Sequence, residues 1–187
     1  MTPPSGARRI LLIEDNPGDV ELVSALLDAT GPDDELVHAP DLAAAGNVLA
    51  SKTFDVILLD LRLPDGEGVD CVQAVRTRSG DIPIVVLTGM EDEALALACI
   101  SAGAQDYIAK SEMRMQTLRR TIDYAVARVG ELRERHRADE LQAHLAAIVE
   151  SSNDAIVSGT LDGIVATWNH GASASSGTRP RRRSVGG

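Results

Sequence analysis

The chain has 187 residues, of which 44% are hydrophobic and 25% charged, with a formal net charge of −10. This length predicts one domain of about 100 to 200 residues plus something incomplete. Because no apolar run approaches the roughly 18 residues that a spanning helix needs, we expect no membrane segment. The amino-terminal stretch MTPPSGARRILLIED lacks a secretory hydrophobic region, so the expected compartment is the cytoplasm.

The charge distribution argues against direct binding of nucleic acid. Four of the arginines lie in the last nine residues, and no acidic residue follows Asp162. The chain up to residue 170 is therefore more acidic than the total suggests, and it repels phosphate backbones. Only four aromatic residues are present, too few for a base-stacking surface. Cys71 and Cys99, 28 residues apart in apolar helical patterns, are expected to be buried, inert thiols.

Five short runs rich in Val, Ile and Leu predict β-strands over residues 9–13, 35–38, 55–59, 82–87 and 106–109. The segments between them have apolar residues at helical spacing. Helix caps are expected at Asn16, which precedes Pro17, and at Asp41, and Gly103 is expected to close the fourth helix. This alternation predicts an α/β fold over residues 8–128, with a parallel sheet covered by helices on both faces.

Polar residues follow the strands of this predicted sheet. Glu14 and Asp15 come after the first strand, Asp60 ends the third, Thr88 the fourth, and Lys110 follows the fifth. Ligands of such sheets bind at the carboxyl ends of the strands. Clustered carboxylates stay ionised only beside a cation, and oxygen ligands suit Mg²⁺. The sequence therefore predicts a divalent metal site beside a hydroxyl and an ammonium group.

Four segments, ILLIEDNPGD, DVILLDLRLPDGEG, PIVVLTG and DYIAKSE, closely resemble the receiver domains of two-component response regulators. The resemblance covers about 120 residues, and the order of its motifs, each after its own strand, is highly specific. It implies a doubly wound, flavodoxin-like fold of five parallel strands in the order 2-1-3-4-5. It also implies a signalling protein that catalyses only its own phosphorylation and dephosphorylation.

The resemblance assigns the metal and phosphate chemistry to particular residues. Asp60 matches the aspartate that receives a phosphoryl group from a histidine kinase. Asp15 matches the direct Mg²⁺ ligand, Glu14 its partner acting through metal-bound water, and the backbone carbonyl of Arg62 a further ligand. Lys110 is placed to pair with the acyl phosphate.

The resemblance further implies a conformational switch. Thr88 is expected to hydrogen-bond a phosphoryl oxygen, and Tyr107 to turn inward when Thr88 moves. Two departures leave points open. Ser111 stands where the family usually has a cis proline, which leaves the reach of Lys110 open. Arg62 and Met90 occupy variable positions that tune phosphate lifetime in the family, so that lifetime is not predicted.

Other classes of protein share this topology. A flavin-binding module needs a phosphate loop rich in hydroxyls or glycine, whereas EDNPGD repels phosphate without a metal. An aspartyl phosphohydrolase usually has a second acid two residues after its nucleophile, where this chain has Arg62. The alternative that stays open is a receiver-like dimerisation module that takes no phosphate. The four histidines, His38, His136, His144 and His170, are assigned no function.

Residues 112–150 predict a long helix. Apolar residues in steps of four and three form a heptad seam that breaks over residues 133–140 and then resumes; its members are Leu118, Ile122, Ala125, Val129, Leu132, Leu141, Leu145 and Ile148. We interpret residues 129–150 as a linker, with a coiled coil and a homodimer through this helix as the hypothesis. The alternative is the receiver's fifth helix followed by a solvated extension.

The segment ESSNDAIVSGTLDGIVATWNHGA resembles the opening of a PAS sensor domain: two strands joined at Asp162–Gly163, then Asn169 as a helix cap. Residues 151–187 are too few for a complete PAS domain. From Gly171 the composition predicts disorder. Back-translation suggests a change of reading frame near Ser173, which would leave Ile156, Val165 and Trp168 exposed.

Overall fold

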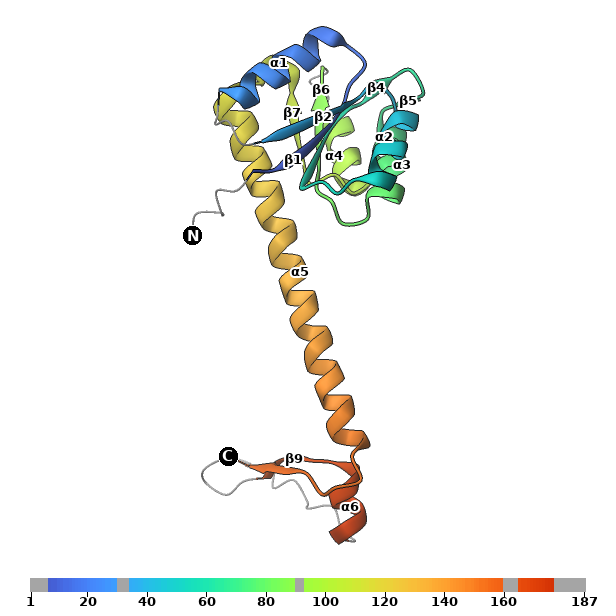
Figure 1. Ribbon diagram of the computed structural model, residues 1–187, viewed down its shortest axis with the longest axis vertical. Coiled ribbons are helices and arrows are strands. Elements are labelled where there is room, and N and C mark those ends of the chain that lie inside the picture. Colours follow the sequence, from blue (N-terminus) through green and yellow to red (C-terminus); the bar gives the residue numbers. More distant parts are fainter. Residues whose placement is uncertain (1–6, 30–33, 90–92, 160–164, 177–187) are drawn as a thin grey trace. The chain divides into compact units, whose positions relative to one another are not determined.

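The computed structural model describes residues 7–29, 34–89, 93–159 and 165–176 (Figure 1). Met90 and the expected turn at Asp162–Gly163 lie outside these ranges. The chain divides into two compact units, Met1–Leu132 and Arg133–Gly187, which are considered separately. Within the described residues, no helix is both long enough and apolar enough to cross a membrane.

The first unit is built on a five-stranded parallel sheet. Its strands are β1 (Arg9–Ile13), β2 (Glu35–Ala39), β3 (Val56–Asp60), β6 (Ile84–Thr88) and β7 (Asp106–Ala109), in the order β2-β1-β3-β6-β7. This confirms the predicted fold and strand order, with strand ends displaced by one or two residues. A small antiparallel pair, β4 (Arg62–Leu63) and β5 (Gly66–Glu67), was not predicted and follows β3.

Helices cover both faces of the sheet. They are α1 (Pro17–Asp28), α2 (Leu42–Ser51), α3 (Val69–Ser79), α4 (Glu93–Ser101) and the first part of α5 (Met115–Ser151), with a short 3₁₀ turn, η1 (Lys110–Glu112). The predicted caps are confirmed: the Asn16 side chain accepts from Gly18 N, and that of Asp41 from Ala44 N. Gly103 has φ +111°, a left-handed conformation that favours glycine, and it follows the end of α4.

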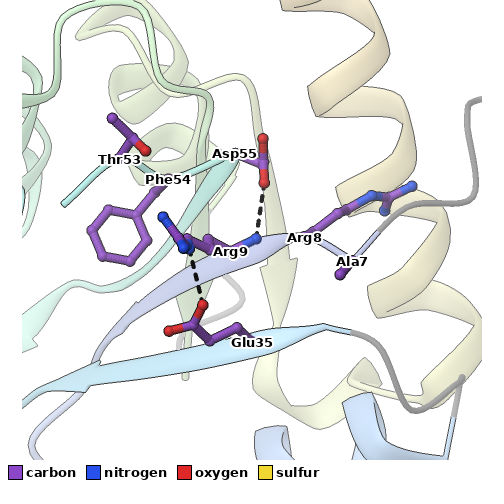
Figure 2. Close-up of a pocket in the computed structure, with 7 residues that line it drawn as sticks. All are labelled: Ala7, Arg8, Arg9, Glu35, Thr53, Phe54 and Asp55. Atoms are coloured by element: carbon purple, nitrogen blue, oxygen red, sulfur yellow. Dashed lines mark hydrogen bonds and ion pairs between the residues drawn. The ribbon is translucent and has the colours of Figure 1, made fainter.

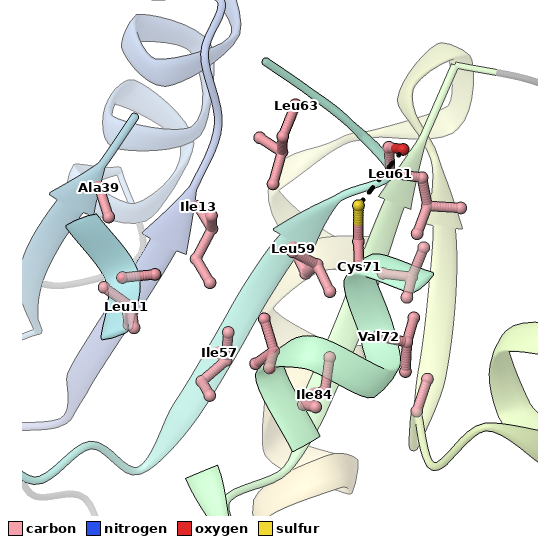
Figure 3. Close-up of a cluster of buried hydrophobic side chains, with 14 of the residues drawn as sticks. Leu11, Ile13, Ala39, Ile57, Leu59, Leu61, Leu63, Cys71, Val72 and Ile84 are labelled. Carbon is pink, nitrogen blue, oxygen red and sulfur yellow. Dashed lines mark hydrogen bonds between the residues drawn. The ribbon is translucent and has the colours of Figure 1, made fainter. Parts of the chain in front are cut away.

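Two apolar layers hold the helices to the sheet because β1, β3 and β6 are buried on both faces. On one face, residues such as Leu11, Ile57 and Ile84 pack with Cys71 and Val72 of α3 (Figure 3). On the other face, Ile10, Leu12 and Val85 pack with side chains of α1 and α5. Both cysteines are free and buried, as predicted.

Helix α5 corrects the interpretation of the heptad seam. Leu118, Ile122 and Ala125 are buried in the core against the sheet, and Val129 is also buried. Over this stretch the spacing of four and three therefore marks a helix packed on a sheet, and not a seam between helices. From residue 130 to residue 151 every side chain of α5 is exposed. A coiled coil in that later stretch stays a prediction.

The second unit contains the antiparallel strands β8 (Val157–Gly159) and β9 (Val165–Trp168), followed by α6 (His170–Ser176). The prediction of disorder from Gly171 is wrong for residues 171–176, which are helical. The predicted cap explains the helix: Asn169 Oδ1 accepts from Ala172 N at 2.9 Å. Ile156 is exposed, as expected, but Trp168 is half-buried and donates from its indole to Ser173 Oγ. Residues 177–187 lie outside the described ranges.

Candidate functional site

Three carboxylates meet at the carboxyl edge of the sheet. Glu14 and Asp15 follow β1, and Asp60 ends the adjacent β3, so the parallel register brings them together. One carboxylate oxygen from each lies within 4.8 Å of the others. Glu14 has no exposed surface and Asp60 is 5% exposed, whereas Asp15 is open to solvent. Hard oxygen donors clustered in this way, with one side facing water, fit a Mg²⁺ ion that keeps part of its hydration shell.

Lys110 supplies the positive charge at this cluster. Its Nζ lies 2.7 Å from Glu14 Oε2, 2.7 Å from Asp19 Oδ2 and 3.2 Å from Asp60 Oδ1. The described residues contain no cis peptide bond, so the bond between Lys110 and Ser111 is trans. The reach of Lys110, which the sequence left open, is therefore sufficient without the proline that the family usually has here.

The cluster changes the acidity of its members. Burial raises the pKa of Glu14, and the hydrogen bonds from Lys110 and from the backbone of Asn16 only partly offset that effect. For Lys110, burial alone would lower the pKa. The hydrogen bonds to Asp19 and Glu14 and the negative charges of Asp60 and Glu14 together outweigh burial, so the pKa of Lys110 lies above its ordinary value and the ammonium stays charged.

Two residues at this edge were missed by the sequence analysis. Asp19, in the first turn of α1, is a direct partner of Lys110. Its position three residues after the capping Asn16, in the first turn of the helix that follows β1, was the available signal. His38, which was assigned no function, has its Nε2 2.7 Å from the backbone oxygen of Glu14 and so supports the backbone of the cluster.

Thr88 and Tyr107 lie on neighbouring strands. Thr88 ends β6 opposite Ala109 of β7, and Tyr107 lies opposite Val86, so both side chains project from the same face of the sheet. Thr88 is buried, at 6% exposure, whereas Tyr107 on the edge strand is 43% exposed. The structure therefore places the expected switch residues two positions apart along one face, with the aromatic ring open to solvent.

Arg62 borders the cluster through both its backbone and its side chain. Its backbone N–H donates to Asp60 Oδ2 at 3.3 Å. Its guanidinium lies over Gly89, where a Cβ atom would be 3.3 Å from Nη2. Arg62, which the sequence analysis named for its backbone carbonyl, thus also places a positive charge beside Gly89, the residue that follows Thr88.

A hollow elsewhere on the first unit is separate from the cluster of carboxylates and Lys110. It is lined by residues at or just before the starts of β1, β2 and β3: Ala7, Arg8, Arg9, Glu35, Thr53, Phe54 and Asp55. Arg9 is held there by its own neighbours (Figure 2). Its Nε donates to Glu35 Oε2 at 2.9 Å, and its backbone N donates to Asp55 Oδ2 at 2.8 Å. These residues lie at the amino ends of the strands, whereas the cluster of Glu14, Asp15 and Asp60 lies at the carboxyl ends.

Comparison with known proteins agrees with this geometry. The family model of the response regulator receiver domain matches residues 10–123. The phosphate regulon transcriptional regulatory protein PhoB of Escherichia coli is 38% identical over 106 residues, which cover 56% of this chain and 45% of PhoB. The cell cycle transcriptional regulator CtrA of Caulobacter vibrioides is 33% identical over 103 residues, 54% of this chain and 43% of CtrA. The chain thus matches less than half the length of these relatives.

Among solved structures, the receiver domain of the sensor histidine kinase PA1611 from Pseudomonas aeruginosa, with a magnesium ion coordinated in its active-site cleft, is 27% identical with a TM-score of 0.57. The alignment covers 65% of this chain and 99% of that domain. With the family model matching more than half of its length and an acidic cluster at the expected edge of the sheet, this chain belongs to the response regulator receiver domain family.

Proposed function

We propose that this receiver domain accepts a phosphoryl group on Asp60 from a histidine kinase, in the presence of Mg²⁺. The observation that carries the proposal is the arrangement of Asp60: a buried carboxylate beside an ammonium group and two further carboxylates. Burial protects an acyl phosphate from bulk water, and the Lys110 ammonium group would offset part of its negative charge.

The chemistry follows from these groups. A carboxylate oxygen of Asp60 attacks phosphorus, the P–N bond of the donor phosphohistidine breaks, and the imidazole leaves with its electron pair and takes up a proton. Asp15, Asp60 and the carbonyl of Arg62 would hold Mg²⁺, with Glu14 acting through water. The ion would neutralise charge on the transferring group. Lys110 would then pair with an oxygen of the acyl phosphate.

The proposed response runs from Thr88 to Tyr107. The Thr88 hydroxyl would follow a phosphoryl oxygen on Asp60, which opens space on the face of the sheet that it shares with Tyr107. Tyr107, now largely exposed, would then turn inward. Residues 129–150 of α5, the proposed linker, would carry the change onward. All of them except Val129 are exposed, and dimerisation through this stretch is the hypothesis.

The second unit is proposed to be the beginning of a PAS-like domain. The supporting observations are the two antiparallel strands and the helix capped by Asn169, in the order that the resemblance implies. A frame change near Ser173 remains part of this proposal. Sequencing of the gene across Ser173 tests it, and a downstream frame without a PAS-like continuation would contradict it.

Labelling with a small acyl-phosphate donor tests the phosphoacceptor. With Mg²⁺, acetyl phosphate should add one phosphoryl group to the wild-type protein, measured by intact mass. Asp60→Asn should abolish the addition, because an amide is not a competent nucleophile. Asp70→Asn, which changes an exposed acid in the first turn of α3, is the matched control and should label normally. Labelling that persists in Asp60→Asn would refute the assignment. A wild type that takes no label would favour the alternative, a dimerisation module without phosphate.

The switch has its own test. Thr88→Ala should still be phosphorylated but should no longer change the environment of Tyr107. NMR of Tyr107 with and without an acyl-phosphate mimic measures this response. A Tyr107 response of wild-type size in Thr88→Ala would contradict the proposed coupling.

A further inference from the structure

The ammonium group of Lys110 is held by three carboxylates in this structure. Its Nζ donates to Glu14 Oε2 and to Asp19 Oδ2, each at 2.7 Å, and forms an ion pair with Asp60 Oδ1 at 3.2 Å. The side chain is only 16% exposed, so water has little access to it. To move closer to a phosphoryl group on Asp60, Lys110 must therefore lengthen or give up one of its two short hydrogen bonds, to Glu14 or to Asp19.

The three partners differ in what their release costs. The Glu14 side chain has no exposed surface, and leaving its charge without a partner inside the protein is strongly unfavourable. Asp60 is the phosphoacceptor itself. The Asp19 side chain is 28% exposed and stands in the first turn of α1, where it can turn to water and still face the positive end of the helix. Asp19 is thus the partner that Lys110 can release most cheaply.

We propose that Asp19 is a positioning residue that holds Lys110 in the unphosphorylated state and must release it before phosphoryl transfer to Asp60. This inference rests on the proposed function, because it concerns the readiness of the same site. The contact makes Lys110 less available in the transition state and so restrains spontaneous phosphorylation. Asp19 touches neither the phosphoryl group nor the metal in this scheme and acts only through Lys110.

The test compares three variants in the full chain at saturating Mg²⁺, with acetyl phosphate as the donor. Asp19→Asn keeps the size of the side chain but removes its charge. Asp19→Glu keeps the charge and should restore the pair. Glu21→Gln removes one charge from an exposed position of the same helix and controls for general electrostatic effects.

Asp19→Asn should raise the maximal rate of phosphorylation by about twofold to fivefold, the range expected when a partly exposed ion pair is lost. The gain should lie in the maximal rate more than in the donor concentration at half-maximal rate, because the contact is released after the donor binds. Asp19→Glu should return the rate toward wild type, and Glu21→Gln should leave it unchanged. NMR of the Lys110 ammonium should show faster hydrogen exchange in Asp19→Asn.

The outcomes separate this inference from the proposed function. A wild type that takes no phosphoryl group refutes the proposed function, whatever the variants do. A wild type that is phosphorylated, with Asp19→Asn equally fast or slower, refutes the restraint by Asp19 and leaves Asp60 as the phosphoacceptor. A gain of equal size in Glu21→Gln would also refute it, because the effect would then be one of overall charge.

Discussion

Replacing Asp15 by asparagine should stabilise the protein without divalent cations and weaken its binding of Mg²⁺. Oxygen atoms of Glu14, Asp15 and Asp60 lie within 4.8 Å of one another, so Asp15 takes part in two like-charge contacts. Because Asp15 is exposed, water screens both contacts, and each repels by about 1 kcal/mol before salt is added. Allowing for salt, we expect the free energy of unfolding to rise by about 1 kcal/mol in metal-free buffer.

Urea unfolding at low ionic strength, with and without Mg²⁺, measures this effect. In metal-free buffer the midpoint for Asp15→Asn should lie about 0.5 M above that of wild type. Mg²⁺ should stabilise the wild type progressively, because it binds the folded state, and should stabilise the variant much less. The order of stability should therefore reverse as Mg²⁺ is added.

Asp70→Asn is the control with the opposite sign, because its carboxylate stands in the first turn of α3, where a negative charge favours the helix. That variant should be neutral or slightly less stable, with a normal response to Mg²⁺. The reasoning fails if Asp15→Asn is less stable than wild type in metal-free buffer, or if Mg²⁺ stabilises both proteins equally.

Three further outcomes are expected. Asn169 is 2% exposed and bonds Val149 O, Ser152 O, Asp154 O, Ile156 N and Ala172 N, so Asn169→Ala should cost the second unit about 3 kcal/mol. Hydrogen exchange over residues 149–173 should then become fast, whereas the exposed Asn153→Ala should leave it unchanged. The Arg76 guanidinium donates to the backbone oxygens of Ile82 and Gly103 and to the side-chain oxygen of Gln105. Arg76→Met should therefore lower the free energy of unfolding by about 2 kcal/mol or more, measured by thermal unfolding. The control Arg78→Met, at an exposed position, should change it little. Burial raises the pKa of Cys71 to about 11, so only about one Cys71 thiol in a thousand is ionised at pH 8. Alkylation of Cys71 by iodoacetamide should therefore be slow until the protein unfolds. Fast alkylation of Cys71 in the folded chain would contradict this prediction. Because folding raises the pKa of this thiol from 9.0 to about 11, the stability that the buried neutral thiol contributes is fully present below pH 9 and is lost as the pH rises through about 11.

Much of the first unit could be predicted from the sequence because its signals are local. The runs of Val, Ile and Leu mark β1, β3 and β6, since a strand buried on both faces needs apolar residues throughout. Asn16 and Asp41 mark helix starts through bonds that span two or three residues. Once the strands are parallel and in order, the residues that follow them must share one edge of the sheet.

The same local periodicity could not say what an apolar helix face packs against. Leu118, Ile122 and Ala125 fit a heptad seam as well as they fit a sheet, and only the tertiary structure places them in the core. Likewise, composition predicted disorder after Gly171, whereas the contacts of Asn169 with residues 149–156 hold a helix there. In both cases the deciding contacts come from outside the segment that was interpreted.

The partners of Lys110 show the same division at the candidate site. The sequence placed Lys110 at the edge of the sheet with Glu14 and Asp60, because each follows a strand. The position of Asp19 near the start of the first helix did not show that it pairs with the Lys110 ammonium group, since those two residues are 91 positions apart and the contact depends on where α1 begins relative to β7. Strand order and the identity of the charged residues are properties of the sequence. The pairing of these charged side chains depends on distances of a few ångströms, and those distances are set only when the sheet and its helices pack together.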